Sequence, residues 1–159
     1  MTDTDFVYTT YLLSTPDEVW KALTDQATIK LYWGVTIDST WDVGSTMSWE
    51  QGGVTVLDPD QIVIESIPPR RLTYTWHTFT PAFAATCGIT GDRLDLVRQE
   101  PRSKVTFEIE PAGVNVKLTL RHDGFSADSI VRESVSDGWP YVLANLKTLL
   151  ETGEPLPDS

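Results

Sequence analysis

The segment IVRESVSDGWPYVLANLKTLLE, residues 130–151, decides the fold of this chain. Ser126 and Ser129 precede it and can each cap a helix, and Gly153 follows it where helices usually stop. The pattern predicts one long amphipathic helix that must bury its apolar stripe against another element. The apolar positions with helical spacing are Val131, Val135, Trp139, Val142, Leu143, Leu146, Leu149 and Leu150.

Trp139-Pro140 lies in the middle of this helix. Pro140 cannot donate to the carbonyl of Ser136 and its ring crowds that turn, so a kink is expected. Two interpretations follow. The kink is a static bend that fits the helix to a curved sheet, or it works with residues 80–102 to control access to the interior.

The rest of the chain alternates in the manner of strands. A strand is expected at Phe6–Leu13, a helix after the cap Thr15, and a second helical piece at Gln26–Tyr32. Short strands then follow up to a hairpin that ends near Arg121. This order predicts an α+β fold, a curved antiparallel sheet of about six or seven strands wrapped round the long C-terminal helix, with two short helices after the first strand.

Residues 80–102 break the alternation and contain two helix-like pieces, Pro81–Ala85 and Asp92–Arg98. We expect a helical insertion here, because long connections in small domains often serve as lids or binding segments. The whole chain, residues 1–159, is expected to form one domain, with an ordered core at about 6–153.

Acidic residues outnumber Lys and Arg by 23 to 12, for a net charge of -11. Such a surface repels phosphate backbones and anionic lipids, so the sequence argues against binding nucleic acid or docking to a membrane. The acidic N-terminus lacks the basic region of a signal peptide, and no apolar run reaches about 20 residues. A soluble cytoplasmic protein is therefore expected.

Several phrases of the chain, in this order, resemble the START-like (SRPBCC, helix-grip or birch-pollen-allergen-like) superfamily. Within it they are most similar to the branch named for the activator of heat-shock-protein-90 ATPase. The resemblance covers about Phe6 to Gly153, and residues 80–102 depart from the shorter loop usual in that branch. The matching phrases are Thr15–Thr24, Trp33-Gly34, Pro68–Trp76, Val116–Phe125, Gly138-Trp139-Pro140 and Asn145–Gly153.

The resemblance implies a cavity between the sheet and the C-terminal helix that holds a small apolar or amphipathic molecule. Aromatic side chains commonly line such cavities. The residues expected to line this one are Trp33, Trp49, Tyr74, Trp76, Phe107, His122, Trp139 and Leu143.

No motif for a nucleophile, a phosphate loop or a zinc helix is present, so we assign no catalytic residue. His77, His122 and Cys87 lie on separate segments, so no metal or other cofactor is expected. Strand parity places His122 with Leu118 and Leu120, facing the cavity. There it either orients a ligand or acts as an acid or base, or it is a structural residue bonded to a neighbouring backbone group. His77 has the opposite parity from Trp76 and is expected to be exposed.

Three functions remain open. The first is small-molecule binding, and the second is a cyclase or hydrolase that uses His122 and a cavity carboxylate. The third is a chaperone ATPase co-regulator, ranked last because a lone domain without a partner module gives it little physical support. A homodimer is compatible with the sequence.

Overall fold

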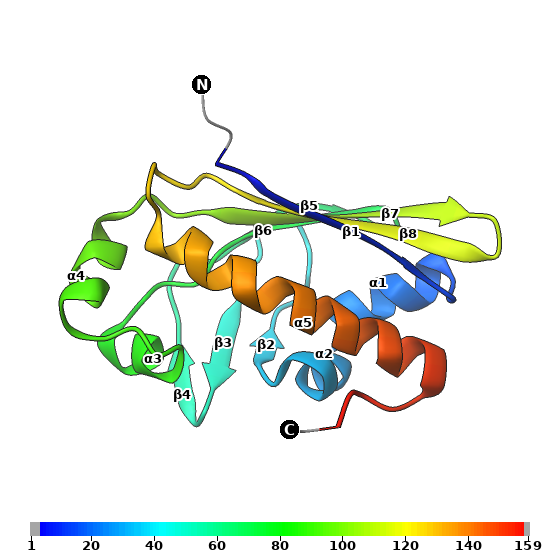
Figure 1. The fold of residues 1–159 in the computed structure, drawn as a ribbon, viewed down its shortest axis with the longest axis horizontal. Coiled ribbons are helices and arrows are strands. Elements are labelled where there is room, and N and C mark those ends of the chain that lie inside the picture. Colours follow the sequence, from blue (N-terminus) through cyan, green and yellow to red (C-terminus); the bar gives the residue numbers. More distant parts are fainter. Residues whose placement is uncertain (1–3, 158–159) are drawn as a thin grey trace.

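The computed structural model describes residues 4–157. The order of elements confirms the α+β fold predicted from the sequence (Figure 1). The elements are β1 (Phe6–Leu12), α1 (Pro16–Thr24), α2 (Gln26–Trp33), β2 (Thr36–Asp38), β3 (Ser48–Gln51), β4 (Val54–Val56), β5 (Val63–Ile67), β6 (Arg71–Thr75), α3 (Pro81–Thr86), α4 (Gly91–Gln99), β7 (Lys104–Ala112), β8 (Asn115–Asp123) and α5 (Ile130–Thr152).

The strands form two antiparallel sheets rather than the single sheet of about six or seven strands that was expected. Five strands pair in the order β1-β8-β7-β6-β5, and three pair in the order β2-β3-β4. An isolated antiparallel β-bridge joins Thr46, just before β3, to Ile62, just before β5. It connects the short sheet to the large one. In Figure 1 the helices α1, α2 and α5 lie on the same side of the five-stranded sheet as the short sheet. The interior is therefore enclosed between the large sheet, the short sheet and α5.

The long C-terminal helix has the boundaries that its caps predicted. The Ser129 side chain accepts a hydrogen bond from the backbone N–H of Arg132, and Gly153 ends the helix in the left-handed region at a φ of 89°. The helix continues through Pro140. Trp139, Leu143 and Leu146 are buried along its inner face, and α5 contacts β1 and α2.

The two helices after β1 are also confirmed. The Thr15 side chain accepts a hydrogen bond from the backbone N–H of Glu18, and Asp25 caps α2 in the same way through Thr28. Gly34 adopts a φ of 83°, which a residue with a Cβ rarely takes, and so ends α2 directly after Trp33. This stop fixes Trp33 at the boundary between α2 and the short sheet.

Residues 80–102 contain the two helices expected there, α3 and α4, between β6 and β7. In Figure 1 both helices (green) lie at one end of the molecule, beside the N-terminal end of α5. Contacts join α3 to β4 and α4 to α5. The insertion therefore packs on the same side of the large sheet as α5.

The expectation that His77 is exposed is wrong, because its side chain is 6% exposed. The strand β6 ends at Thr75, two residues earlier than His77. The alternation of strand faces stops with the strand, so parity counted from Trp76 does not apply to His77.

Candidate functional site

A cavity of about 260 Å³ lies between α5, the end of α2, the short sheet and the segment after β6. We call it the tryptophan cavity, since four of its wall residues are tryptophans. Its lining residues are Trp33, Val35, Trp49, Gln51, Trp76, His77, Cys87, Ser134, Val135, Gly138, Trp139 and Val142.

The four tryptophans come from four different parts of the chain and meet as one cluster. The ring centroid of Trp33 lies 5.5 Å from that of Trp49 and 5.0 Å from that of Trp139. Trp76 completes the cluster at 5.1 Å from Trp49 and 5.6 Å from Trp139. These are ordinary distances for tilted and edge-to-face aromatic pairs, so the wall is a packed aromatic surface.

Half of the residues expected to line the cavity do so, namely Trp33, Trp49, Trp76 and Trp139. The other four, Tyr74, Phe107, His122 and Leu143, are each at most 2% exposed and do not line the tryptophan cavity. They belong to the core. Phe107, for example, packs its ring edge-on against Trp139 at 5.9 Å.

His122 is held by two side chains instead of by a backbone group. The indole N–H of Trp139 donates to Nδ1 of His122 at 3.0 Å, and Nε2 lies 2.8 Å from Oγ of Ser103. An indole nitrogen can only donate, so Nδ1 carries the lone pair and the proton of the neutral ring is on Nε2. Burial lowers the pKa of His122 to about 3, and His77 adds to this effect. Both nitrogens are occupied, and His122 is neutral at pH 7.

His77 is a cavity residue that parity did not predict. Its Nδ1 lies 3.1 Å from the carbonyl oxygen of Thr78, which can only accept, so the proton of the neutral ring is on Nδ1. Burial lowers the pKa of His77 to about 4. The ring lies 5.1 Å from Trp49 and 5.0 Å from Trp76.

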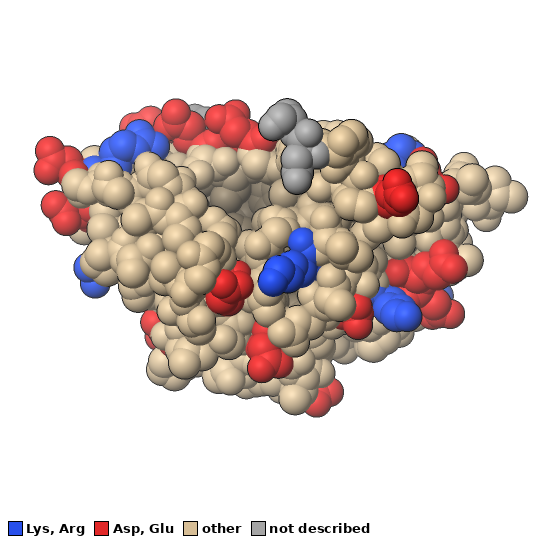
Figure 2. All heavy atoms as spheres, turned by 90° about the horizontal axis from the view of Figure 1, so that it is seen from below, with Lys and Arg blue, Asp and Glu red and all other residues tan. Residues whose placement is uncertain are grey.

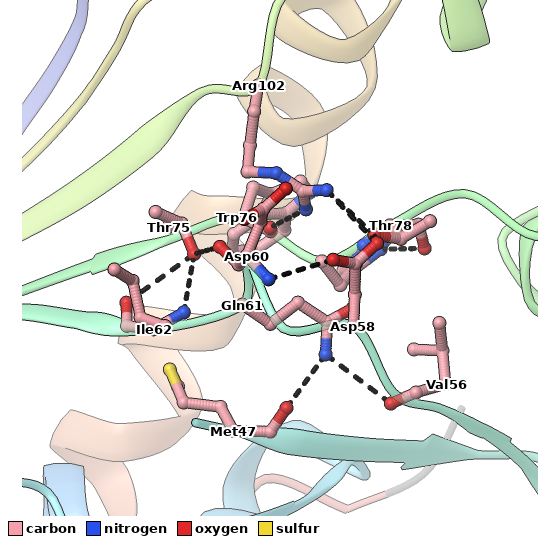
Figure 3. Close-up of polar contacts among 11 residues, drawn as sticks. Met47, Val56, Asp58, Asp60, Gln61, Ile62, Thr75, Trp76, Thr78 and Arg102 are labelled. Carbon is pink, nitrogen blue, oxygen red and sulfur yellow. Dashed lines mark hydrogen bonds and ion pairs between the residues drawn. The ribbon is translucent and has the colours of Figure 1, made fainter. Parts of the chain in front are cut away.

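A buried glutamine holds the segment that carries His77 (Figure 3). Gln61 is fully buried, and its Nε2 donates to the carbonyl of Met47 at 2.8 Å and to that of Val56 at 3.4 Å. Its Oε1 accepts from the backbone N–H of Thr78 at 2.8 Å. One side chain thus ties the short sheet to the irregular segment after β6.

A charged network anchors the same segment from the insertion side. The hydroxyl of Thr78 donates to Asp58 at 2.6 Å and accepts from Arg102 at 2.9 Å (Figure 3). Arg102 also donates to the carbonyl of Trp76 at 2.9 Å. The hydrogen bond from Thr78 lowers the pKa of Asp58. Residues on both sides of His77 are therefore fixed by specific bonds.

A second cavity of about 310 Å³ shares Trp76 and His77 with the tryptophan cavity. Its wall is more polar, since it includes Arg98, Glu100 and Arg102 from the insertion. Ser103, the partner of His122, also lines it. Trp76 and His77 are thus common to the walls of an apolar cavity and a polar one.

The tryptophan cavity reaches solvent beside α5, where Ser134 and Gly138 are exposed. Cys87 and Gln51 form part of the wall between the insertion and β3, and Gln51 donates to the carbonyl of Thr86 at 3.1 Å. Burial raises the pKa of the half-buried Cys87 thiol. Figure 2 shows a hollow in the face formed by α2, α3 and the short sheet, bordered mainly by uncharged side chains.

Over residues 4–157, no three His, Cys, Asp or Glu side chains come together in a group that could hold a metal ion. Within the same residues, no helix combines the length and the apolar character needed to cross a membrane.

Residues 14–151 match the family described as Activator of Hsp90 ATPase homolog 1-like protein. The chain belongs to this family. The match spans most of the chain, from the residue before the cap of α1 to the last turn of α5. It confirms the resemblance drawn from the sequence phrases. No curated protein matches the chain in sequence.

Solved structures share the fold at low sequence identity. The Aha1 dimer from Colwellia psychrerythraea has a TM-score of 0.69 at 19% identity, over 94% of this chain and 97% of that one. Protein MLL2253 from Mesorhizobium loti has a TM-score of 0.70 at 23% identity, over 92% and 96%. DynU16, a protein of the dynemicin biosynthetic locus, has a TM-score of 0.66 at 18% identity, over 97% of this chain and 49% of that one. These likenesses establish the helix-grip fold.

Proposed function

We propose that the protein binds a small apolar or amphipathic molecule in the tryptophan cavity. The observation that supports this proposal is the convergence of four tryptophans round 260 Å³ of space with no charged side chain in the wall. An apolar cavity of about 150 Å³ accepts a benzene molecule, so the volume here suits a ligand of about two rings. Ligand cavities in proteins are typically apolar with a few polar groups, which is the composition of this wall.

Catalysis is a weaker proposal for this site. The enzyme hypothesis relied on His122, which does not line the tryptophan cavity and has both nitrogens bonded to side chains. A general base must reach the proton that it removes. His77 does line the cavity, but no carboxylate joins it in the wall. The chaperone co-regulator role needs a protein-binding surface instead of this cavity, so we rank it last.

A substitution at the cavity mouth tests the binding proposal. Gly138 lines the cavity, and a Cβ built on it meets no other atom within 4 Å. The backbone can therefore carry a leucine side chain at this position, and we expect that side chain to block the cavity mouth. Ala144 is an exposed position on the same helix that does not line the cavity. Gly138→Leu and Ala144→Leu therefore form a matched pair.

The measurement is the melting temperature across a panel of one- to three-ring apolar and amphipathic compounds. A ligand at about 100 times its Kd adds about 2.7 kcal/mol, which raises the melting temperature by roughly 5 to 10 °C for a chain of this size. We expect such a rise in the wild type and in Ala144→Leu, and its loss in Gly138→Leu. Equal shifts in all three proteins would place binding elsewhere, and no shift with any compound would contradict the proposal.

We further propose that a second copy of this chain is its macromolecular partner. The Colwellia relative of the same fold is described as a dimer. In this chain β1 is an edge strand of the large sheet, and Val7 and Tyr11 on it are 46% and 52% exposed. Edge strands with apolar side chains favour pairing. Light scattering after size exclusion tests this, and a monomer mass at every concentration would contradict it.

A further inference from the structure

The cavity of about 310 Å³ beside the insertion combines apolar side chains with two arginines, Arg98 and Arg102, and we call it the arginine cavity. The apolar residues of its wall are Trp76, Phe79, Val97, Pro101 and Val131. Three of them, Trp76, Val97 and Val131, are at most 7% exposed and belong to the packed core. A hydrated inorganic ion gains little from such a surface, whereas an organic ion can bury its apolar part against it.

Arg98 is the uncommitted cation of this wall. It lies in the last turn of α4 and is exposed. Within residues 4–157 it makes no ion pair and no side-chain hydrogen bond. A guanidinium carries five N–H donors in a planar fork that matches a carboxylate. The charge of Arg98 is therefore available to an anion in the cavity.

Arg102 is the second cation, and the protein holds it in place (Figure 3). It donates to the carbonyl of Trp76 and to the hydroxyl of Thr78, each at 2.9 Å, and pairs with Asp58 at 3.4 Å. These contacts use at most three of its five N–H groups. At least two donors of a positioned guanidinium thus remain for a ligand.

Glu100 is the one acidic side chain among the described residues of the wall, and its carboxylate is already engaged. It accepts from the hydroxyl of Ser129 and from the backbone N–H of Ile130 at 3.0 Å, at the positive end of the α5 dipole. His77 is neutral at pH 7, since burial lowers its pKa to about 4. Two arginines and one glutamate leave the wall with a formal charge of +1, in a chain whose net charge is -11. One bound monoanion neutralises it.

We infer that the arginine cavity is a second binding site, for an aromatic carboxylate whose charged group pairs with Arg98 and Arg102 and whose ring packs on Trp76. A cavity of about 150 Å³ accepts benzene, so the volume here suits one or two rings together with the carboxylate. The inference does not rest on the proposed function, because it concerns a different cavity and a charged ligand. It gives the insertion a role, since both arginines belong to residues 80–102.

Three probes separate the charge of the ligand from its ring. The probe 2-naphthoate has both, 2-naphthamide keeps the rings without the charge, and acetate keeps the charge without the rings. Calorimetric titration should show 2-naphthoate binding at least about tenfold tighter than either of the others. Its affinity should fall in high salt, because exposed charges are screened. The titration is made on the wild type and on Gly138→Leu, in which the tryptophan cavity should be blocked but the arginine cavity is not altered.

Two arginine variants locate the site. Arg98→Gln should weaken 2-naphthoate by about tenfold and leave 2-naphthamide within about twofold of its wild-type affinity. Arg93→Gln is the matched control, since Arg93 is exposed on the same helix and does not line the cavity. It should leave both affinities within about twofold of the wild type. Both substitutions replace exposed side chains, so both proteins should fold.

Equal affinities for 2-naphthoate and 2-naphthamide, or equal losses in Arg98→Gln and Arg93→Gln, would overturn the inference. Binding of acetate as tight as that of 2-naphthoate would also do so, because it would show an anion site without an apolar part. If 2-naphthoate binds the wild type but not Gly138→Leu, its site is the tryptophan cavity. That result would reject a site in the arginine cavity and leave the proposed function intact.

Discussion

Trp139 on the long helix donates its indole N–H to Nδ1 of His122 on the large sheet, at 3.0 Å. Both residues are buried, at 2% and 0% exposure. The bond joins α5 to β8 and fixes the tautomer of the histidine, whose other nitrogen meets Ser103. The same tryptophan ring presents a surface to the tryptophan cavity. The contact that holds the helix to the sheet therefore also sets the position of one cavity wall.

Trp139→Phe should destabilise the fold. The change leaves a void and removes the only described donor to Nδ1 of His122, so we expect a loss of about 2–4 kcal/mol in the free energy of unfolding. Urea unfolding measures it. Tyr141→Phe on the same helix alters an exposed side chain and should cost less than about 0.5 kcal/mol. Similar costs for the two variants would show that the bond to His122 contributes little.

Stability should fall in mildly acidic solution because two histidines are buried in the neutral form. The pKa is about 4 for His77 and about 3 for His122, both below the ordinary value of 6.5. The unfolded chain thus binds more protons than the native state once the pH drops below 6.5. From pH 7 to pH 4 each histidine should lower the free energy of unfolding by on the order of 3 kcal/mol.

His122→Gln provides the control for this pH dependence, since its amide can both accept and donate but does not titrate. Denaturant unfolding at a series of pH values should show a shallower decline below pH 6.5 in this variant than in the wild type. An unchanged slope would mean that His122 is not buried in the neutral form.

Gly138→Ala should stabilise the protein without altering the cavity greatly. Gly138 lies inside α5, and an added Cβ meets no atom within 4 Å. Replacing a helical glycine by alanine typically gains about 0.5–1 kcal/mol. A higher urea midpoint with an unchanged slope would agree with this expectation. A lower midpoint would show that Gly138 has a conformation that alanine does not tolerate.

Glu100, just after α4, should be important for the N-terminus of α5. Its carboxylate accepts from the hydroxyl of Ser129 and from the backbone N–H of Ile130 at 3.0 Å. Glu100→Ala removes a negative charge and an acceptor from a helix N-terminus, so a loss of about 1–2 kcal/mol is expected. Hydrogen exchange should quicken in α4 and in the first turn of α5.

Glu133→Ala separates the loss of negative charge from the loss of the hydrogen-bond acceptor. Glu133 also lies in the first turn of α5 but is exposed. It should produce only the small charge effect and leave exchange in α4 unchanged. Faster exchange in α4 in both variants would contradict a specific role for Glu100.

The sequence predicted the elements well where local signals decide them. Thr15 and Ser129 accept the hydrogen bonds typical of N-caps, and the apolar spacing of residues 130–151 indicated both the length and the inner face of α5. Four of the eight expected cavity residues line the cavity, all of them tryptophans. Large aromatic side chains reach from one element to the next, which makes them reliable markers of a shared interior.

Features that depend on where a strand stops or on distant contacts were not predictable. The parity of His77 failed because β6 ends at Thr75, and the buried Gln61 that holds the next segment has no local signature. Gln51 and Cys87 enter the wall only because the insertion packs against the short sheet. Val135 and Val142, by contrast, share the helical face of Trp139 and could have been found from their spacing.

Native mass spectrometry of the protein purified from its own host tests the central claim most directly. The account predicts an additional mass from a small apolar or amphipathic molecule, which is present under native conditions and lost on denaturation. The additional mass should be absent from Gly138→Leu and retained in Ala144→Leu. Only the mass of the bare chain in the wild type, together with no change in melting temperature across the compound panel, would contradict the account.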